Sequence, residues 1–280
     1  MLERQSGRVT IETGVVFGTG GGRELRCDVY RPPEGTSNGC GVLLIHGGGW
    51  MQGDRTQLRG YGILLGRKGY TCVACEYRLS GEAKWPAQLH DVKAALRWMR
   101  ANARTLAIDP GKIAVEGNSA GGHLALMLGA TPNAPEFEGD GGHPGVSTEV
   151  AAVIAFYAPA LLGASGLPLS GPVAALMGPG ATHDDVLRAS PVTYARREFP
   201  PTQLFHGTKD ELVPVSESLR MFEALRDAGA RVELHAYEGA PHAFDALPDF
   251  GRQCAEIMAL FLDRHVVNPR PVSLPQPATA

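Results

Sequence analysis

Short apolar runs alternate with amphipathic stretches along the chain from about residue 40 onward. The runs are rich in β-branched residues and apolar on both sides, which predicts β-strands covered on both faces of a sheet. We expect these strands at residues 41–46, 70–77, 112–116, 150–157, 202–206 and 232–237. Between them, apolar residues recur with a period near 3.6, which predicts helices with one apolar face. The alternation predicts an α/β fold with a mostly parallel central sheet and helices on both faces.

The N-terminal region and two later segments depart from this alternation. Residues 9–17 and 24–30 predict two strands around a glycine-rich turn, and therefore an antiparallel hairpin at the edge of the sheet. Segments 131–145 and 161–185 are rich in Gly and Pro. Because both follow sheet elements at positions where such folds carry insertions over a binding site, we interpret them as loops or a small cap.

The C-terminal end of the chain differs in composition from the rest. Residues 270–280 contain three prolines and predict a flexible, Pro-rich tail. A chain of 280 residues can bury one large core or two modest ones. We expect residues 1–269 to form a single α/β domain.

Charge and cysteine content restrict the partners and the compartment. The 26 Lys and Arg residues and the 29 Asp and Glu residues are scattered along the chain, which disfavours nucleic acid or an anionic membrane as a partner. No secretory signal and no membrane-spanning apolar run of about 18 residues is visible. Five cysteines are too few and too odd in number for a disulfide framework, so we expect free thiols and a cytoplasmic protein.

Two of these cysteines, Cys72 and Cys75, form a C-x-x-C sequence inside the strand expected at 70–77. Redox pairs of this spacing lie at a helix N-terminus instead. The odd spacing directs the two side chains to opposite faces of a strand, so we interpret both as buried apolar residues.

The motif with the clearest chemistry is Gly-Asn-Ser-Ala-Gly at residues 117–121, between the strand at 112–116 and a helix-like segment at 122–129. This G-x-S-x-G pattern holds a serine above the edge of a sheet on a sharp strand-to-helix turn, where larger neighbours would clash. A helix N-terminus also favours developing negative charge. Ser119 is therefore the candidate nucleophile, and a simple helix N-cap is the alternative.

A second motif, His-Gly-Gly-Gly-Trp at residues 46–50, follows the first parallel strand. Three successive glycines cost backbone entropy, and they let the main chain approach a ligand and direct its N–H groups inward. We interpret this loop as part of an oxyanion hole, with a structural hydrogen-bonding role for His46.

A nucleophilic serine needs a base and an orienting carboxylate. Asp210 and His242 each follow a late strand at its carboxyl end, where catalytic residues of open α/β sheets gather. Asp245 and Asp249 are rivals for the acid, but their place in the same loop or helix start makes the far nitrogen of His242 hard to reach. The order Ser119, Asp210, His242 is that of the α/β-hydrolases.

Several motifs together resemble the hormone-sensitive-lipase-like and carbohydrate-esterase branch of the α/β-hydrolases, whose members include feruloyl and acetyl esterases. The matching sequences are HGGGW at 46–50, YRLSGEAKWPAQLHDVKAALRWMR at 77–100, GNSAGGHLA at 117–125, HGTKDELVP at 206–214 and GAPHAF at 239–244. The resemblance spans roughly residues 25–265. It implies an oxyanion hole made by the backbone N–H groups of Gly48, Gly49 and Ala120.

The resemblance also implies a carboxylic ester hydrolase acting through an acyl-enzyme on short-chain acyl esters, or on acetylated or feruloylated carbohydrate. Many lipase-like members carry a long helical N-terminal cap, whereas about forty residues that read as strands precede HGGGW here. We therefore expect an open acyl pocket that prefers acetyl and butyryl esters. Candidate substrate-binding residues are Trp50, Trp85, Tyr157 and Leu161, each of which is equally compatible with ordinary core.

Two other functions stay open at this stage. One is an amide hydrolase of the arylformamidase type; a peptidase is disfavoured because the chain has no length for a large accessory domain. The other is a non-catalytic binding protein on the same scaffold. No cofactor is expected, and the histidines and cysteines lack the spacing of metal ligands. The expected partner is a small ester, with a homodimer left open.

Overall fold

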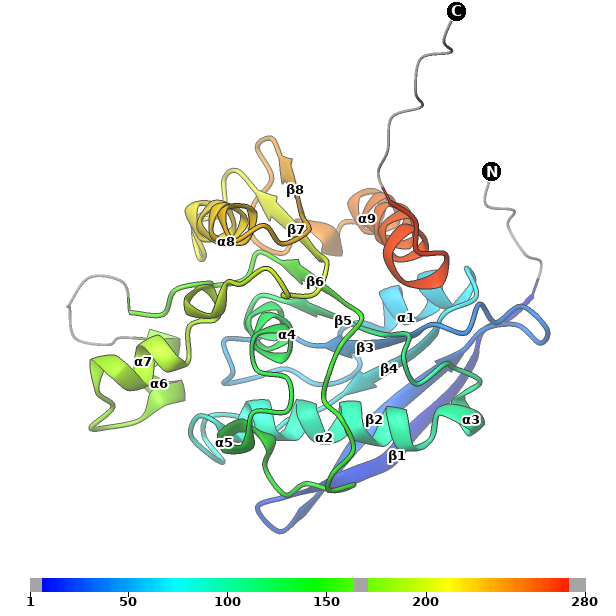
Figure 1. Cartoon of the computed structure of the whole chain (residues 1–280), viewed down its shortest axis with the longest axis horizontal. Helices are drawn as coiled ribbons and strands as arrows, with labels where there is room; N and C mark the ends of the chain where they lie inside the picture. Colours follow the sequence, from blue (N-terminus) through cyan, green and yellow to red (C-terminus); the bar gives the residue numbers. More distant parts are fainter. Residues whose placement is uncertain (1–6, 164–170, 272–280) are drawn as a thin grey trace, which may run out of the picture.

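The computed structural model describes residues 7–163 and 171–271, and in these residues the centre of the protein is one eight-stranded sheet (Figure 1). The strands are β1 (Thr10–Gly20), β2 (Arg23–Arg31), β3 (Gly41–Ile45), β4 (Thr71–Cys75), β5 (Ile113–Asn118), β6 (Ala152–Phe156), β7 (Thr202–Gly207) and β8 (Val232–Tyr237). They lie in the order β1-β2-β4-β3-β5-β6-β7-β8. β1, β2 and β4 pair antiparallel, and every later pair is parallel. The predicted mostly parallel sheet and edge hairpin are confirmed.

Helices cover both faces of this sheet, as the amphipathic pattern predicts. The helices are α1 (Arg59–Gly66), α2 (Ala87–Ala101), α3 (Ala103–Leu106), α4 (Ala120–Ala130), α5 (Pro135–Glu138), α6 (Gly171–Met177), α7 (His183–Arg188), α8 (Ser216–Asp227) and α9 (Pro248–Leu262). Short 3₁₀ turns lie at Pro191–Tyr194 and Phe244–Ala246, and a π turn at Asp263–Val267 follows α9. Apolar residues of α2, α4 and α8 form the core on one face, and those of α1 and α9 form the core on the other.

The two cysteines of the C-x-x-C sequence lie on β4 with their side chains in different cores. Cys75 packs in the core beneath α2 and α4, and Cys72 packs in the core beneath α1 and α9. Successive side chains of a strand alternate between its faces, so a spacing of three separates them. All five cysteines are buried free thiols, as predicted.

The last strand, β8, differs from its prediction as a strand covered on both faces. All but one of its residues are half-buried, and Ala236 is exposed. The reason is its position, since β8 is the last strand of the sheet and has a neighbour, β7, on only one side. The polar residues Glu233 and His235 are tolerated there because an edge strand keeps contact with water.

The described parts of the two Gly- and Pro-rich segments form short helices outside the sheet. In segment 131–145, α5 lies against α2, where Lys93 Nζ donates to Glu138 Oε1 at 2.7 Å. The described part of segment 161–185 contains α6 and the start of α7, and it joins α5 in lining a pocket of about 350 Å³. Of the predicted tail 270–280, residues 272–280 lie outside the described part of the chain.

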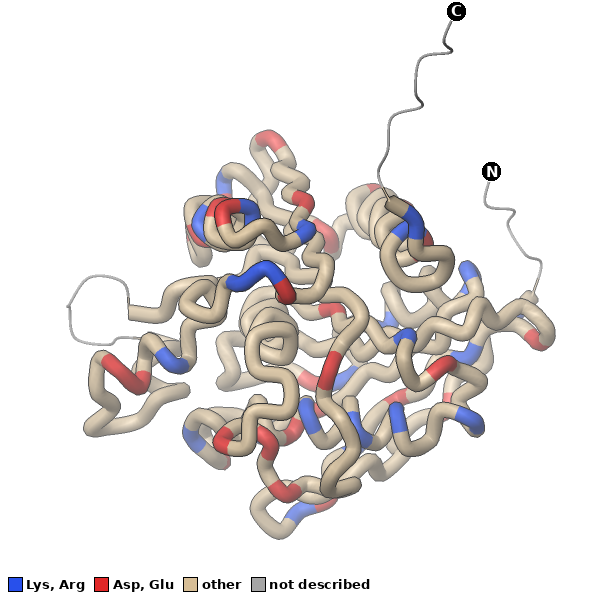
Figure 2. Tube along the Cα trace, in the orientation of Figure 1, with Lys and Arg blue, Asp and Glu red and all other residues tan. Residues whose placement is uncertain are grey.

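Acidic and basic residues are interspersed along the fold, as their scatter in the sequence predicts (Figure 2). In the described ranges, no helix has the length and apolar content that crossing a membrane requires.

Candidate active site

Ser119 lies on the sharp turn between β5 and α4. Its φ of +55° is unusual for a residue with a side chain, and its N–H donates to Phe156 O at 2.9 Å. The turn closes only because its neighbours are glycines. A Cβ at Gly117 would lie 2.2 Å from Gly121 O, and one at Gly121 would lie 2.0 Å from Ile45 O. The sequence therefore forces the serine to the tip of the turn at the carboxyl edge of the sheet.

The three predicted triad residues are in hydrogen-bond contact. Ser119 Oγ lies 3.1 Å from His242 Nε2, and His242 Nδ1 lies 2.6 Å from Asp210 Oδ2. Asp210 follows β7, and His242 follows β8, so two neighbouring strand ends bring them together. With Nδ1–H directed at the carboxylate, the lone pair of Nε2 faces the serine hydroxyl and can accept its proton.

The carboxylate of Asp210 is fixed by the turn that carries it. Its second oxygen, Oδ1, accepts the backbone N–H groups of Leu212 and Val213, both at 2.9 Å. The residue is only 8% exposed. These bonds stabilise the charged carboxylate and hold Oδ2 toward the histidine ring.

His206, whose role the sequence did not indicate, supports this turn from β7. Its Nε2–H donates to Val213 O at 2.8 Å, and the hydroxyl of Ser218 donates to its Nδ1 at 2.7 Å. Burial lowers the pKa of His206, so the ring is neutral and can both donate and accept. His206 belongs to the HGTKD sequence, and its position at the end of a buried strand was the available signal.

The glycine loop lies directly against the turn of the nucleophile. A Cβ at Gly47 would lie 2.9 Å from Asn118 O and 3.4 Å from Ser119 Cβ. Gly48 and Gly49 have φ values of +112° and +61°, which favour glycine. Ala120 begins α4, where the first backbone N–H groups lack partners within the helix. Gly47, which precedes Gly48 and Gly49, therefore lies against the nucleophile turn, and Ala120 directly follows Ser119.

His46 anchors the start of the glycine loop, in line with its predicted structural role. Its ring stacks on Tyr77 at 4.2 Å between centroids, and its Nδ1–H donates to Gly47 O at 2.8 Å. The hydroxyl of Tyr77 donates to His46 O at 3.0 Å. Burial lowers the pKa of His46, which keeps the ring neutral.

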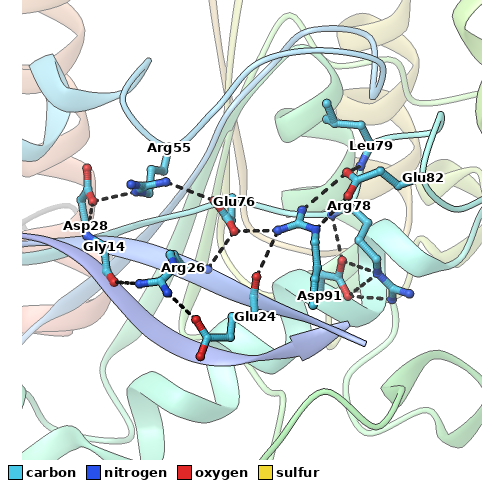
Figure 3. A network of polar contacts seen from close by, with 11 residues as sticks. Gly14, Glu24, Arg26, Asp28, Arg55, Glu76, Arg78, Leu79, Glu82 and Asp91 are labelled. Carbon is cyan, nitrogen blue, oxygen red and sulfur yellow. Dashed lines mark hydrogen bonds and ion pairs between the residues drawn. The ribbon is translucent and has the colours of Figure 1, made fainter. Parts of the chain in front are cut away.

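Charged residues tie the far side of the same loop to the N-terminal hairpin (Figure 3). Arg55 donates to Asp28 on β2 at 2.8 Å and to Glu76 at 3.1 Å, and Glu76 also accepts from Arg23 at 2.8 Å. The Asp28 side chain is only 4% exposed, so its charge needs a partner inside the protein, and Arg55 supplies it. The network connects the loop after the glycines to β2 and to the residue that follows β4.

The four candidate substrate-binding residues differ in their surroundings. Trp50 and Tyr157 are each only 3% exposed and pack in the interior. They are buried because Trp50 packs edge-on against His123 and Tyr157 packs on Phe244. Trp85 is half-buried and lines the pocket near α5 to α7. Leu161 is half-buried, and its N–H donates to Glu217 Oε2 at 2.8 Å.

The rival carboxylates lie away from Nδ1 of His242. Asp249 is 94% exposed at its side chain and pairs with Arg252 on the same helix. Asp245 accepts hydrogen bonds from Tyr61, Asn118 and Tyr157. The contact with the histidine ring is made by Asp210. Among the residues with described positions, no group of three or more His, Cys, Asp or Glu is arranged to hold a metal ion.

Comparison with known families and relatives agrees with this geometry. The sequence model of the family described as BD-FAE matches residues 27–225, which include Ser119 and Asp210. A carboxylic ester hydrolase of Mycobacterium tuberculosis, LipM, is 34% identical over 81% of the chain, and esterase LipC of the same organism is 33% identical over 85%. The chain spans 54% of LipM and 61% of LipC.

Solved structures share the whole fold. A truncated carbohydrate esterase from gut microbiota superposes with a TM-score of 0.81, covering 92% of this chain and 98% of that one, at 24% identity. Esterase 2 of Thermogutta terrifontis, in a propionate-bound structure, superposes with a TM-score of 0.78 at 27% identity, covering 96% and 98% of the two chains. A structure of the same esterase phosphonylated by sarin has a TM-score of 0.77. The α/β-hydrolase fold is thereby confirmed.

Proposed function

Because the chain belongs to the BD-FAE family of α/β-hydrolases, we propose that it is a serine esterase that hydrolyses small carboxylic esters through an acyl-enzyme intermediate. One observation carries the proposal: His242 lies between Ser119 Oγ, at 3.1 Å, and Asp210 Oδ2, at 2.6 Å. A base within hydrogen-bond reach of a hydroxyl, itself oriented by a carboxylate, is the arrangement that activates a serine.

The reaction proceeds in two acyl-transfer steps. His242 Nε2 takes the proton of Ser119 as the hydroxyl oxygen attacks the ester carbonyl carbon, and Asp210 stabilises the imidazolium that forms. His242 then gives the proton to the leaving alcohol, and the acyl group stays on Ser119. Water attacks the acyl-enzyme with the same proton transfers, which releases the carboxylic acid and restores the serine.

The negative charge of each tetrahedral intermediate needs donors beside the nucleophile. We assign this role to the backbone N–H groups of Gly48, Gly49 and Ala120, in the glycine loop and the first turn of α4. The close approach of Gly47 to Asn118 and Ser119 supports the assignment, because it brings the loop within reach of the reacting carbon. Donors of this kind are typically worth about 3 kcal/mol each in the transition state.

Esters with short acyl groups, such as acetylated carbohydrate, fit the proposal best, and feruloylated carbohydrate is the aromatic alternative. The described residues before the glycine loop form the hairpin β1–β2 and strand β3, which belong to the sheet. A carbohydrate esterase and a propionate-bound esterase are among the structures with the same fold.

The proposal is tested by steady-state hydrolysis of p-nitrophenyl acetate, butyrate and octanoate. We expect turnover of the acetyl and butyryl esters to exceed that of octanoate, and Ser119→Ala to abolish it. Ser37→Ala, at an exposed position before β3, is the matched control and should retain wild-type rates.

Unchanged hydrolysis by Ser119→Ala would reject the proposed nucleophile. In the wild type, a panel of acetylated xylo-oligosaccharides, methyl ferulate and N-formylkynurenine compares different acyl groups and leaving groups. Turnover of the formamide without turnover of any ester would replace the esterase with an arylformamidase, and a preference for octanoate would reject the short-acyl specificity.

A further inference from the structure

A second carboxylate, Asp245, lies three residues after the triad histidine and joins elements that are distant in sequence. Its Oδ2 accepts from Tyr61 Oη of α1 at 3.0 Å and from Asn118 Nδ2 at the end of β5 at 2.7 Å. Its Oδ1 accepts from Tyr157 Oη, directly after β6, at 2.5 Å. Asn118 Nδ2 also donates to Tyr157 Oη at 2.7 Å. The four side chains therefore form a closed cluster around one carboxylate.

This cluster touches both the nucleophile turn and the histidine. Asn118 is the residue before Ser119, and the ring of Tyr157 lies 4.5 Å from the ring of His242, measured between centroids. Asp245 belongs to the same loop as His242. The cluster thus connects the two catalytic turns by a route that does not pass through the Ser119–His242 hydrogen bond.

The backbone at these positions adopts conformations that side chains disfavour. Ser119, Tyr157 and Ala243 have φ values of +55°, +36° and +57°. Such conformations are strained and persist where surrounding contacts over-determine them. The carboxylate of Asp245 binds Tyr157 and Asn118, the residue before Ser119, and Asp245 itself lies two residues after Ala243. Its hydrogen bonds therefore oppose relaxation of all three turns.

The two tyrosine hydroxyl groups of the cluster keep their protons at neutral pH. Burial, followed by the negative charge of Asp245, raises the pKa of Tyr157 and of Tyr61 well above the ordinary tyrosine value. Both hydroxyl groups therefore remain donors to the carboxylate. Three donors on two oxygens give Asp245 a fixed orientation.

We propose that Asp245 is a positioning residue that sets the distance between Ser119 and His242 by binding Asn118, Tyr157 and Tyr61. The inference rests on the proposed function, because it names what holds the nucleophile and the base in register. Asp245 touches no reacting atom. It acts through the turns that carry Ser119 and His242, and loss of about 1 Å in such a placement can cost on the order of 10²-fold in rate.

The test compares Asp245→Ala, Asp245→Asn and Tyr157→Phe with the wild type. We expect Asp245→Ala to lower kcat about 10- to 100-fold while KM for p-nitrophenyl acetate changes less than about threefold, since the substrate site is intact. Asp245→Asn keeps the shape and one acceptor oxygen and should fall between. Asp249→Asn, which removes an exposed acid from the same region, is the matched control and should match the wild type.

A purely structural role is separated from positioning by two further measurements. Rates are taken well below each variant's Tm, where a merely destabilised enzyme would retain its kcat. In the double variant Asp245→Ala/Tyr157→Phe, the loss in kcat should be smaller than the product of the single losses, because the two groups act through one contact. Full additivity, or a kcat of Asp245→Ala within twofold of the wild type, would overturn the inference.

The rate at which a fluorophosphonate probe labels Ser119 keeps this test independent of the ester substrate. We expect slower labelling of Asp245→Ala than of the wild type and of Asp249→Asn. A wild type that labels but cleaves no ester would reject the proposed function alone, and the labelling rates would still decide on Asp245. Equal labelling of Asp245→Ala and wild type would overturn the positioning role.

Discussion

Glu116 is a fully buried carboxyl group on β5, and its replacement by Gln should change how stability depends on pH. The residue is 0% exposed, and neither carboxyl oxygen has a hydrogen-bond partner in the described part of the chain. Burial, followed by the negative charge of Asp245, raises the pKa of Glu116 well above its ordinary value of 4.5. The folded protein therefore keeps this proton under conditions where the unfolded chain has released it.

The sign of the effect follows from the number of bound protons. Between the ordinary pKa and the raised pKa of Glu116, the folded state binds more protons than the unfolded state, so the free energy of unfolding falls as pH rises. Below the ordinary pKa both states are protonated and the contribution is complete. The slope is about 1.4 kcal/mol for each pH unit inside the window, because one pKa unit corresponds to that free energy.

The measurement is urea unfolding of wild type and Glu116→Gln at a series of pH values from about 5 upward. Gln cannot ionise, so the wild type should lose about 1.4 kcal/mol relative to Glu116→Gln for each pH unit until the raised pKa is reached. Glu198→Gln, at an exposed position, controls for the removal of a carboxyl group. A difference between wild type and Glu116→Gln that is the same at every pH would refute a protonated, buried Glu116.

Three further outcomes follow from the packing. Gly48→Ala would place a Cβ 2.0 Å from Gln52 O at a φ of +112°, so the loop must shift: kcat should fall about 100-fold in steady-state assays, and Tm should fall as well. Gly117→Ala would place a Cβ 2.2 Å from Gly121 O and should lower the free energy of unfolding in urea by about 3 kcal/mol or more. At Gly60 in α1 an added Cβ meets no atom within 4 Å, so Gly60→Ala should raise the free energy of unfolding by about 0.5–1 kcal/mol. All five cysteines are buried, and burial raises the pKa of Cys27 and of Cys40 to about 12. A thiol reagent should therefore label no cysteine of the folded protein and all five in urea. Rapid labelling without urea would contradict the buried positions.

The strands could be located from the sequence because their signals are local. Each apolar run between turn residues became a strand within a few residues of its predicted ends, and β5 continues to Asn118, two residues beyond its prediction. Burial was predicted less well at the edge, since the sequence of β8 does not tell that only one strand neighbours it. The order of the strands, with β4 between β2 and β3, also depends on long-range pairing that no local pattern records.

In the candidate site, too, the residues with a local signal could be predicted, and those whose surroundings depend on distant residues could not. Ser119, Asp210 and His242 were found because each lies in a short motif at the carboxyl end of a predicted strand, and the structure brings them into contact. Trp50 and Tyr157 could not be assigned to pocket or core from the sequence, because an aromatic residue after a strand can point into the core as readily as into a pocket. Their burial depends on side chains from other elements, such as His123 and Phe244.

Asp245 illustrates why the reacting groups are easier to find than the groups that hold them. Its closeness to His242 in sequence is the reason that it was set aside as the triad acid, and the structure gives that position to Asp210. The partners of Asp245 lie 88 to 184 residues away along the chain. Removal of a triad residue takes away a step of the reaction, whereas removal of Asp245 leaves every reacting group present and alters only their placement. Residual Ser119-dependent turnover in Asp245→Ala, with none in Ser119→Ala, is therefore the pattern that distinguishes the two kinds of residue.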